Sequence, residues 1–496
     1  MSNPIPHPHE ERRSTTLAWL GGSLSVALLV RLALWLGYSP VPYSDTPSYR
    51  RLAESVLDGF ARYDGTRTPG YPAFLALVGG DIQVWLVQMA MGVLITLALF
   101  YLGWRLSGRG WFGALAALAH TLNLGQLFFE ANLLTETLTT FYLAFIYVGY
   151  FWLLGQESRP RWGLALGMGL ATSLALLTRP LFIFLPVWVG LFITWRISPH
   201  YPPSSHPENG RASRPAFKMI QAYFLNRVGL ARLAVFALPV VLLVGGWVLF
   251  IHQRFGDWGL TTMTGYHLVQ HTGGYFEYVP DEYAALRDIY IQFRDAKIAA
   301  TGTQTNAIWE AIPELSRVTG LNFYDLSRTM ARISVQLILE HPDLFLKNVL
   351  QGWWMFWRAP VYWAPEALQN PESAEAIAGL VLLQRGVLLA INLMFVIGSL
   401  AWAGACYLPS RLIKRLPSLF QRLQDAFVPG SPDDLTSQVH QRFMLCLAST
   451  IWITSIVQSL LDHGDNPRFL LPLQSFVVLW VAWFGLRILR KPDRAP

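Results

Sequence analysis

The amino-acid sequence predicts an all-α integral membrane protein built as a multi-helix bundle. Hydrophobic residues make up 53% of the 496-residue chain and charged residues only 14%. Long apolar segments are therefore expected in place of an ordinary water-facing core. Basic residues recur between these segments, and two long polar stretches interrupt them. These three observations together disfavour a soluble protein.

Ten segments approach the ~20 apolar residues that a helix needs to cross a bilayer. They are residues 16–37, 84–106, 111–127, 137–154, 162–178, 181–195, 233–251, 386–405, 443–461 and 469–486. About ten transmembrane helices are predicted from them. The first segment contains Arg31, and no small-residue cleavage pattern follows it, so we interpret it as a retained helix and not as a signal peptide.

The positive charges predict the orientation of the helices. A net charge of +7 would suggest nucleic-acid binding in a soluble protein, but here the positive-inside rule accounts for it and no nucleic-acid partner is expected. With a cytoplasmic N terminus, all the basic clusters lie on the cytoplasmic side, and ten crossings return the C terminus there. The clusters comprise Arg12, Arg13, Arg105, Arg109, Arg159, Arg161, Arg211, Arg214, Lys218, Arg227, Arg232, Arg411, Lys414, Arg415, Arg487, Arg490, Lys491 and Arg494.

This topology divides the chain into three parts. Residues 1–251 form an N-terminal transmembrane module whose first external loop is 38–83. Residues 252–384 form an extracytoplasmic, interfacial segment long enough for a small helical subdomain. Residues 385–496 form the C-terminal transmembrane helices.

The external segment is expected to contain amphipathic helices. Residues 281–300 and 322–340 have apolar residues at helical spacing, with Pro or Gly at their borders. Residues 344–363 are rich in tryptophan but also carry polar and basic residues, which indicates a helix lying on the membrane surface. His267 and His271 would suit a metal site on a helix, but the Thr272-Gly273-Gly274 that follows favours a loop.

Two carboxylates are candidates for catalysis. Ser44 or Asp45 is expected to cap a surface helix that has Pro47 in its first turn, yet Asp45, just beyond a membrane helix, is also placed to act as a base on a lipid-borne substrate. Glu136, at the mouth of the fourth apolar segment, reaches the same face, where it would stabilise a helix N terminus or work with Asp45. The one cofactor that these residues suggest is a divalent metal ion shared between them; otherwise they would divide the roles of base and acceptor orienter.

Four arginines approach the same face of the membrane. Arg31 lies within the first helix and Arg179 between the fifth and sixth, while Arg385 enters the eighth and Arg468 opens the tenth. A charge at such depth is costly unless it is paired, so each is a functional candidate. The alternatives are ion pairs with the carboxylates or snorkelling to lipid headgroups. A cluster of guanidinium groups beside hydrocarbon suits a lipid-linked phosphate.

These residues form a pattern that resembles the bacterial branch of the dolichyl-phosphate-mannose protein mannosyltransferase and aminoarabinose transferase families. The resemblance covers most of the chain, and the Asp45 loop and the Arg-x-Pro-Gly-Tyr-Pro stretch are its more specific parts. It is carried by Arg31, Ser44-Asp45, Tyr49, Arg67-Thr68-Pro69-Gly70-Tyr71-Pro72, Thr135-Glu136, Thr178-Arg179-Pro180, His341-Pro342 and Arg468-Phe469-Leu470-Leu471-Pro472. Some members have two adjacent acidic residues in the first loop, whereas Ser44 and Thr46 flank Asp45 here.

The resemblance implies the membrane glycosyltransferase C fold in the plasma (inner) membrane. It also implies transfer of a sugar from a polyprenyl-phosphate donor to an acceptor protein, lipid or glycan on the extracytoplasmic side. Asp45 would be the catalytic base and Glu136 the second acidic residue, with Arg67 or Arg179 facing the donor phosphate. The remaining candidates for substrate binding are Arg31, Tyr49, Tyr71, Arg385 and Arg468.

Two other functions fit the same residues. A flippase or transporter of lipid-linked sugars also needs a hydrophobic bundle and phosphate-binding arginines, and a non-catalytic assembly subunit is a third possibility. No Gly-rich phosphate loop, zinc motif or nucleophile elbow occurs, so chemistry on a soluble nucleotide has no support in the sequence.

Overall fold

The computed structural model describes residues 12–43, 45–155, 161–195, 227–359, 361–407, 418–427, 434–461, 463 and 466–489. Within these ranges the regular structure is helical, and only two isolated bridges, Tyr38–Leu368 and Val41–Asn132, have β pairing. The predicted all-α class is confirmed. Several residues used in the sequence analysis lie outside these ranges: Ser44, Arg159, Arg211, Arg214, Lys218, Arg411, Lys414, Arg415, Arg490, Lys491 and Arg494.

Seven helices or helical runs of the described chain are long and apolar enough to cross a membrane. They are α1 (Arg13–Gly37), α4 (Asp81–Ser107), α7 (Glu136–Leu154), α11 (Arg227–Pro239) continued by η2 (Val240–Gly245) and α12 (Gly246–Phe255), α18 (Ala374–Tyr407), α21 (Leu435–Leu461), and η7 (Asn466–Leu470) continued by α22 (Leu471–Leu489). A multi-pass membrane protein is thereby confirmed. The eighth predicted crossing begins earlier than expected, because α18 extends back from 386 to Ala374.

The other three predicted crossings are helical but short or bent. α5 (Gly110–Thr121) and α6 (Leu124–Ala131) meet at an angle of 53°. The bend falls at Asn123, whose side chain accepts hydrogen bonds from the backbone N–H groups of Gly125 and Gln126 and so starts a new helix. α8 (Trp162–Thr178) and η1 (Pro180–Phe184) with α9 (Leu185–Thr194) are shorter than the seven long runs. The number of crossings stays a prediction.

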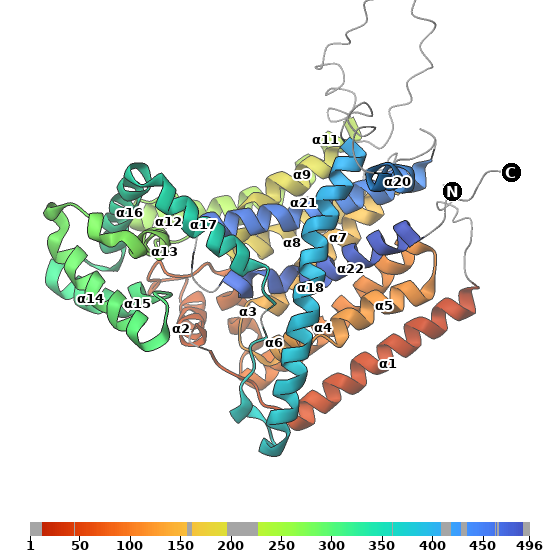
Figure 1. Cartoon of the computed structure of the whole chain (residues 1–496), viewed down its shortest axis with the longest axis horizontal. Coiled ribbons are helices and arrows are strands. Elements are labelled where there is room, and N and C mark those ends of the chain that lie inside the picture. The colour runs from red at the N-terminus through yellow and green to blue at the C-terminus, as the bar shows by residue number, and fades with distance from the viewer. Residues whose placement is uncertain are drawn as a thin grey trace, which may run out of the picture.

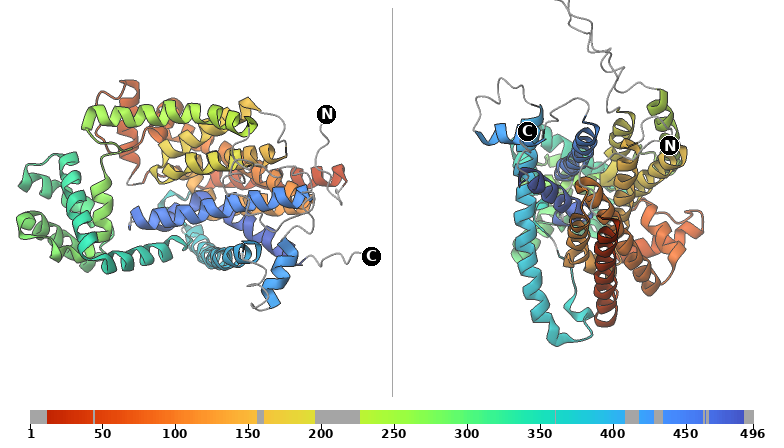
Figure 2. Two further views of the ribbon diagram at one scale, coloured as in Figure 1. Left: turned by 90° about the horizontal axis from the view of Figure 1, so that it is seen from above. Right: turned by 90° about the vertical axis from the view of Figure 1, so that its right-hand side faces the viewer.

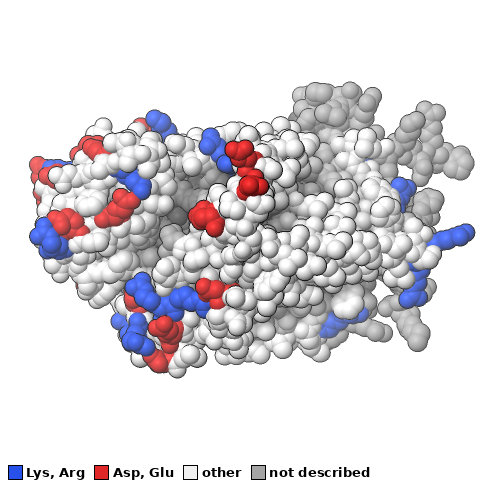
Figure 3. All heavy atoms as spheres, turned by 90° about the horizontal axis from the view of Figure 1, so that it is seen from below, with Lys and Arg blue, Asp and Glu red and all other residues white. Residues whose placement is uncertain are grey.

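The bundle has two chemically different ends. α1 begins and α22 ends at one end, together with the turn from α4 to α5, whereas α2 (Thr46–Leu57), α3 (Gly70–Val78) and the helices of the 264–340 segment lie at the other (Figures 1 and 2). We call these the basic end and the distal end. On the face in Figure 3 the basic end shows only Lys and Arg, the distal end shows both signs of charge, and an uncharged belt lies between them. This distribution is typical of a membrane-spanning bundle.

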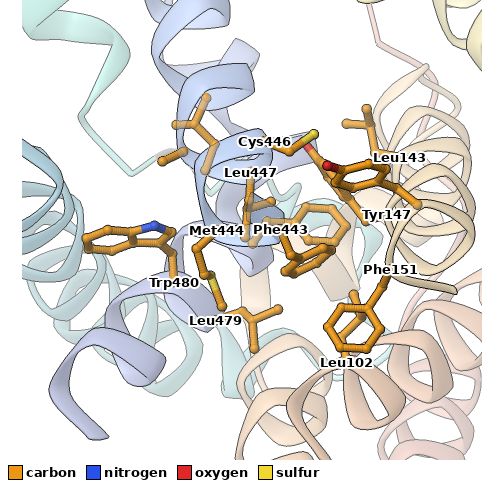
Figure 4. Packing of buried hydrophobic residues seen from close by; sticks show 14 of the residues in the cluster. Leu102, Leu143, Tyr147, Phe151, Phe443, Met444, Cys446, Leu447, Leu479 and Trp480 are labelled. Carbon is orange, nitrogen blue, oxygen red and sulfur yellow. The ribbon is translucent and has the colours of Figure 1, made fainter. Parts of the chain in front are cut away.

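Aromatic and aliphatic side chains fill the interior of the bundle. Phe443 of α21 packs edge-on against Phe151 of α7, with ring centroids 5.1 Å apart, and Tyr147 contacts the same ring (Figure 4). Trp480 of α22 is fully buried in the same cluster. Exposed leucines such as Leu29 and Leu36 of α1 lie on the outside, as expected where lipid is the solvent.

The distal end carries a small helical subdomain with its own core. Its helices are α13 (Thr264–Thr272), α14 (Ala284–Thr301), α15 (Ala307–Thr319) and α16 (Phe323–Glu340), with the short turns η3 (Gly273–Tyr278) and η4 (Asp281–Tyr283) between them. The predicted helices at 281–300 and 322–340 are confirmed as α14 and α16. The side chain of Asn322 caps α16 by accepting a hydrogen bond from the Asp325 N–H.

The remaining elements connect the subdomain to the bundle. α17 (Pro342–Phe356) is not among the helices long and apolar enough to cross a membrane, and it packs on α21 and η7. The 3-10 turns η5 (Pro365–Ala367) and η6 (Pro371–Ser373) lead into α18, and α20 (Ser418–Phe427) packs on α18 and α22.

One local prediction was wrong. The stretch that contains His267 and His271 is the helix α13 and not a loop. Gly273 and Gly274 follow the helix and do not interrupt it. The two rings nevertheless have different neighbours, because His267 packs against Trp309 whereas His271 packs against Phe345 and His463.

Candidate active site

Five charged residues from four distant parts of the chain form a continuous series of ion pairs at the distal end. Asp45 Oδ1 lies 2.7 Å from Arg67 Nη2, and its Oδ2 lies 2.8 Å from Arg468 Nη1. Arg468 also donates through Nε to Glu136 Oε1, and Arg179 Nη1 lies 3.0 Å from the same oxygen. We call this series, Arg67–Asp45–Arg468–Glu136–Arg179, the ion-pair chain.

Asp45 is placed by the start of α2 but does not cap it. Its main-chain oxygen accepts hydrogen bonds from the N–H groups of Ser48 and Tyr49, while its side chain makes no capping hydrogen bond. The cap expected of the Asp45 side chain is therefore absent, and Ser44, the other predicted cap, lies outside the described residues. The carboxylate instead turns toward the two arginines, where both partners of each hydrogen bond are charged.

Glu136 and its two arginines lie where helices begin or end. Glu136 is the first residue of α7, Arg179 follows α8, and Arg468 lies in η7 just before α22. The Glu136 side chain is fully buried, and its Oε2 has no hydrogen-bond partner among the described residues. A negative charge at a helix N terminus is favourable, so the position at the start of α7 and the two arginines both stabilise this carboxylate.

Aromatic residues hold Arg67 in place. Its guanidinium lies 5.0 Å from the ring centroid of Tyr49, and its Nε donates to Ser48 Oγ at 3.1 Å. Tyr63 Oη donates to the main-chain oxygen of Arg67 at 2.6 Å. Tyr71 packs edge-on against Tyr49 and is fully buried, so it supports the site from behind and does not line it.

The ion-pair chain borders a cavity of about 350 Å³ between the bundle and α13. Arg67, Arg179 and Arg468 line it together with many apolar side chains. Its full lining is Asp45, Tyr49, Thr66, Arg67, Thr68, Thr135, Thr178, Arg179, Pro180, Leu181, Ile183, Gly259, Leu260, Thr261, Met263, Thr264, His267, Leu268, Gln458, Leu461, Arg468 and Phe469. Ile183 and Leu461 of this lining are about half exposed, so the apolar wall of the cavity is not enclosed.

The charges of the ion-pair chain differ in accessibility, with Arg67 the most exposed and Glu136 the least. Side-chain exposure is 26% for Arg67, 25% for Asp45, 15% for Arg468, 6% for Arg179 and 0% for Glu136. Burial raises the pKa of Asp45, but the charges of Arg67 and Arg468 outweigh it and lower the pKa to about 2. Asp45 is thus ionised at neutral pH. With three guanidinium groups and two carboxylates, the ion-pair chain has a formal net charge of +1.

The site does not fit the divalent metal ion that the sequence suggested. The Arg468 guanidinium lies between the two carboxylates and binds an oxygen of each, where a shared cation would have to lie. Asp45 uses its other oxygen for Arg67. No group of three or more His, Cys, Asp or Glu side chains in the described ranges is arranged to hold a metal.

Two of the predicted substrate-binding arginines lie elsewhere. Arg31 is buried in α1 and pairs with Glu130 of α6, with 2.9 Å between Arg31 Nε and Glu130 Oε2. Arg385 is exposed on α18 and does not line the cavity. Arg31 thus has the ion-pair partner that was one of its alternatives, and Arg385 lies on the surface away from the cavity. The predicted residues that come together at one site are Arg67, Arg179, Arg468, Asp45, Glu136 and Tyr49.

Sequence reasoning missed the contributions of Tyr63, Gly70 and the cavity wall at 259–268. The wall has no motif, since it forms only when the subdomain packs on the bundle. Gly70 could have been recognised, because it lies inside the Arg67–Pro72 stretch. A Cβ atom on Gly70 would come 2.6 Å from the backbone nitrogen of Thr178, next to Arg179.

Gly70→Ala is expected to lower the free energy of unfolding by about 1–3 kcal/mol, because the added methyl overpacks a backbone contact between α3 and the end of α8. Unfolding in detergent measures the loss. Gly163→Ala in α8 is the matched control, since a Cβ atom there has open space around it. Equal stability of the two variants would contradict a tight contact at Gly70.

The chain was compared with family models, with curated proteins and with solved structures, and none of the three comparisons found a match.

Proposed function

We propose that the protein is a glycosyltransferase that moves a sugar from a polyprenyl-phosphate donor to an acceptor on the extracytoplasmic side. The observation that carries the proposal is a carboxylate flanked by arginines beside an apolar cavity at one end of a membrane bundle. The polar part of this cavity suits a phosphate, and its apolar wall suits the first units of an isoprenoid chain. Exposed Ile183 and Leu461 would let the rest of that chain pass into the bilayer.

The charge of the site supports a phosphodiester donor. A sugar joined to a lipid through one phosphate carries a single negative charge, which balances the net +1 of the ion-pair chain. After transfer the lipid monophosphate carries one more negative charge than the diester. Arg67, Arg179 and Arg468 are placed to stabilise that added charge as it develops.

The reaction would be a single displacement. Asp45 takes the proton from the acceptor hydroxyl, the acceptor oxygen bonds to the anomeric carbon, and the bond from that carbon to the phosphate oxygen breaks with its electron pair going to the phosphate. One displacement inverts the anomeric configuration. Glu136 would hold Arg468 and Arg179 in position, and no strong general acid is needed because the leaving group is already a phosphate.

The topology of the proposed enzyme follows from the positive-inside rule. The bent pair α5–α6 and the short helices α8 and α9 each count as one crossing in this proposal, which makes ten crossings. Both termini would then lie in the cytoplasm and the distal end outside the plasma membrane. The membrane glycosyltransferase C fold is part of the same proposal.

The test is a transfer assay with the full-length protein in nanodiscs and a polyprenyl-phosphate sugar labelled in the sugar. Cell-envelope extract supplies acceptors, and mass analysis identifies the product. Appearance of the label on a protein, lipid or glycan supports a transferase. In sealed vesicles, movement of intact donor across the bilayer without loss of sugar would identify a flippase, and neither activity with any donor would favour an assembly subunit.

A further inference from the structure

The two arginines that a phosphate in the cavity would reach first are the two that hold Asp45. Arg67 and Arg468 are more exposed than Arg179, and all three line the cavity. Each of the two gives one Nη group to one carboxylate oxygen of Asp45. A carboxylate with both oxygens bound to guanidinium groups is a poor proton acceptor. A phosphate that binds the same Nη groups must therefore compete with Asp45.

We propose that the phosphodiester of the donor displaces Asp45 from Arg67 and Arg468, and that this displacement makes Asp45 available as the base. The proposal rests on the proposed function and adds an order of events to it. Donor binding precedes proton removal from the acceptor, so the base acts only when an anomeric carbon is in place.

The contacts of both arginines are arranged for such an exchange. Arg67 is held through Nε by Ser48 Oγ and through its face by the Tyr49 ring. Arg468 is held through Nε by Glu136. In both residues the anchoring atom is Nε and the group on Asp45 is an Nη. The Nη groups can thus pass from carboxylate to phosphate while each guanidinium keeps its anchor.

Charged and titratable groups face Asp45 from several elements, and Arg67 and Arg468 are the ones that favour its ionised form. Arg67 and Arg468 contact it directly, Tyr49 lies in α2, which begins just after Asp45, and His267 lines the same cavity. Behind Arg468 lie Glu136 and Arg179, which pair with each other. Replacement of the two arginine contacts by a neighbouring anion raises the pKa of Asp45 from its value of about 2.

Proton uptake on binding tests this exchange. The probe is farnesyl methyl phosphodiester, which has no sugar and one charge that does not titrate in the range used, and dimethyl phosphate serves as the tail-free arm. Calorimetry of the full-length protein in nanodiscs, in buffers with different ionisation enthalpies, counts the protons. Because the pKa of Asp45 rises from about 2 when the probe binds, we expect the wild-type protein to take up a fraction of a proton at pH 4.5 and none at pH 7.5. Proton uptake with both probes supports displacement of Asp45 by the phosphodiester anion alone. Uptake with the farnesyl probe only supports displacement by a lipid-linked phosphate.

The Asp45→Asn variant is expected to take up no proton when the farnesyl probe binds. It should bind this probe about three- to tenfold more tightly than the wild type, because the probe no longer competes with a carboxylate for the arginines. Asp58→Asn is the matched control, since Asp58 pairs with Arg62 on the surface of the same loop. Binding without proton uptake and with equal affinity in wild type and Asp45→Asn would overturn the displacement and leave the proposed function standing. Absence of binding to every form would overturn both. The wild-type proton count decides the question even if Asp45→Asn fails to fold.

Discussion

Asp45→Asn is expected to lower kcat for sugar transfer by about 10³-fold, within the 10² to 10⁴ that general bases contribute. Asn has nearly the shape of Asp but cannot accept the acceptor's proton. Donor binding should be kept or strengthened, because Arg67, Arg179 and Arg468 stay in the cavity. Single-turnover transfer from a labelled polyprenyl-phosphate sugar measures kcat separately from donor affinity.

The control for this variant is Asp58→Asn, an exposed carboxylate of the same loop that lies outside the cavity. Its kcat should equal that of the wild type. Unchanged turnover in Asp45→Asn would exclude Asp45 as the base. A transporter with the same arginines would keep most of its transport activity after this substitution. The variant therefore also separates a transferase from a transporter.

Glu130→Leu is expected to lower the free energy of unfolding by about 3–5 kcal/mol, the range for breaking a buried ion pair. Arg31 and Glu130 are 3% and 1% exposed, and among the described residues the leucine would leave the Arg31 guanidinium with only the Ala27 carbonyl as an acceptor. The close approach of α4 adds to the cost of any rearrangement, since a Cβ atom on Gly92 would come 1.9 Å from Glu130 Oε1. Unfolding in detergent gives the change.

Two further variants identify the cause of that loss. Arg31→Met combined with Glu130→Leu should recover most of the stability, because no buried charge is left without a partner. Asp81→Leu, which breaks the exposed pair with Arg50, should cost less than about 1 kcal/mol. A double variant as unstable as Glu130→Leu would show that the loss comes from packing around Gly92 and not from the uncompensated charge.

The sequence by itself determined that its ten apolar segments are helical and that the chain is a membrane protein. Each of the ten apolar segments coincides with helix, because a backbone in hydrocarbon has to satisfy its hydrogen bonds internally. The helices α14 and α16 followed from their amphipathic spacing. α13 was not predicted because Thr272-Gly273-Gly274 favoured a loop for the residues before them, whereas the helix extends to Thr272 and ends there.

The sequence also supplied the residues of the candidate site but not their partners. Asp45, Glu136 and the arginines stood out as charges at membrane depth or just beyond a membrane helix. Their alternatives, capping, pairing and snorkelling, could not be separated, because helical periodicity shows which residues share a face but not which helix that face meets.

Only the tertiary structure decided the pairing. Arg31 meets Glu130, 99 residues away, and is removed from the site, whereas Arg468 meets Asp45 across 423 residues and joins it. Both arginines satisfy the same physical demand, that a charge in a low-dielectric interior must have a partner. Which carboxylate each one finds depends on the packing of the helices, and that packing places Arg67, Asp45 and Arg468 at the cavity.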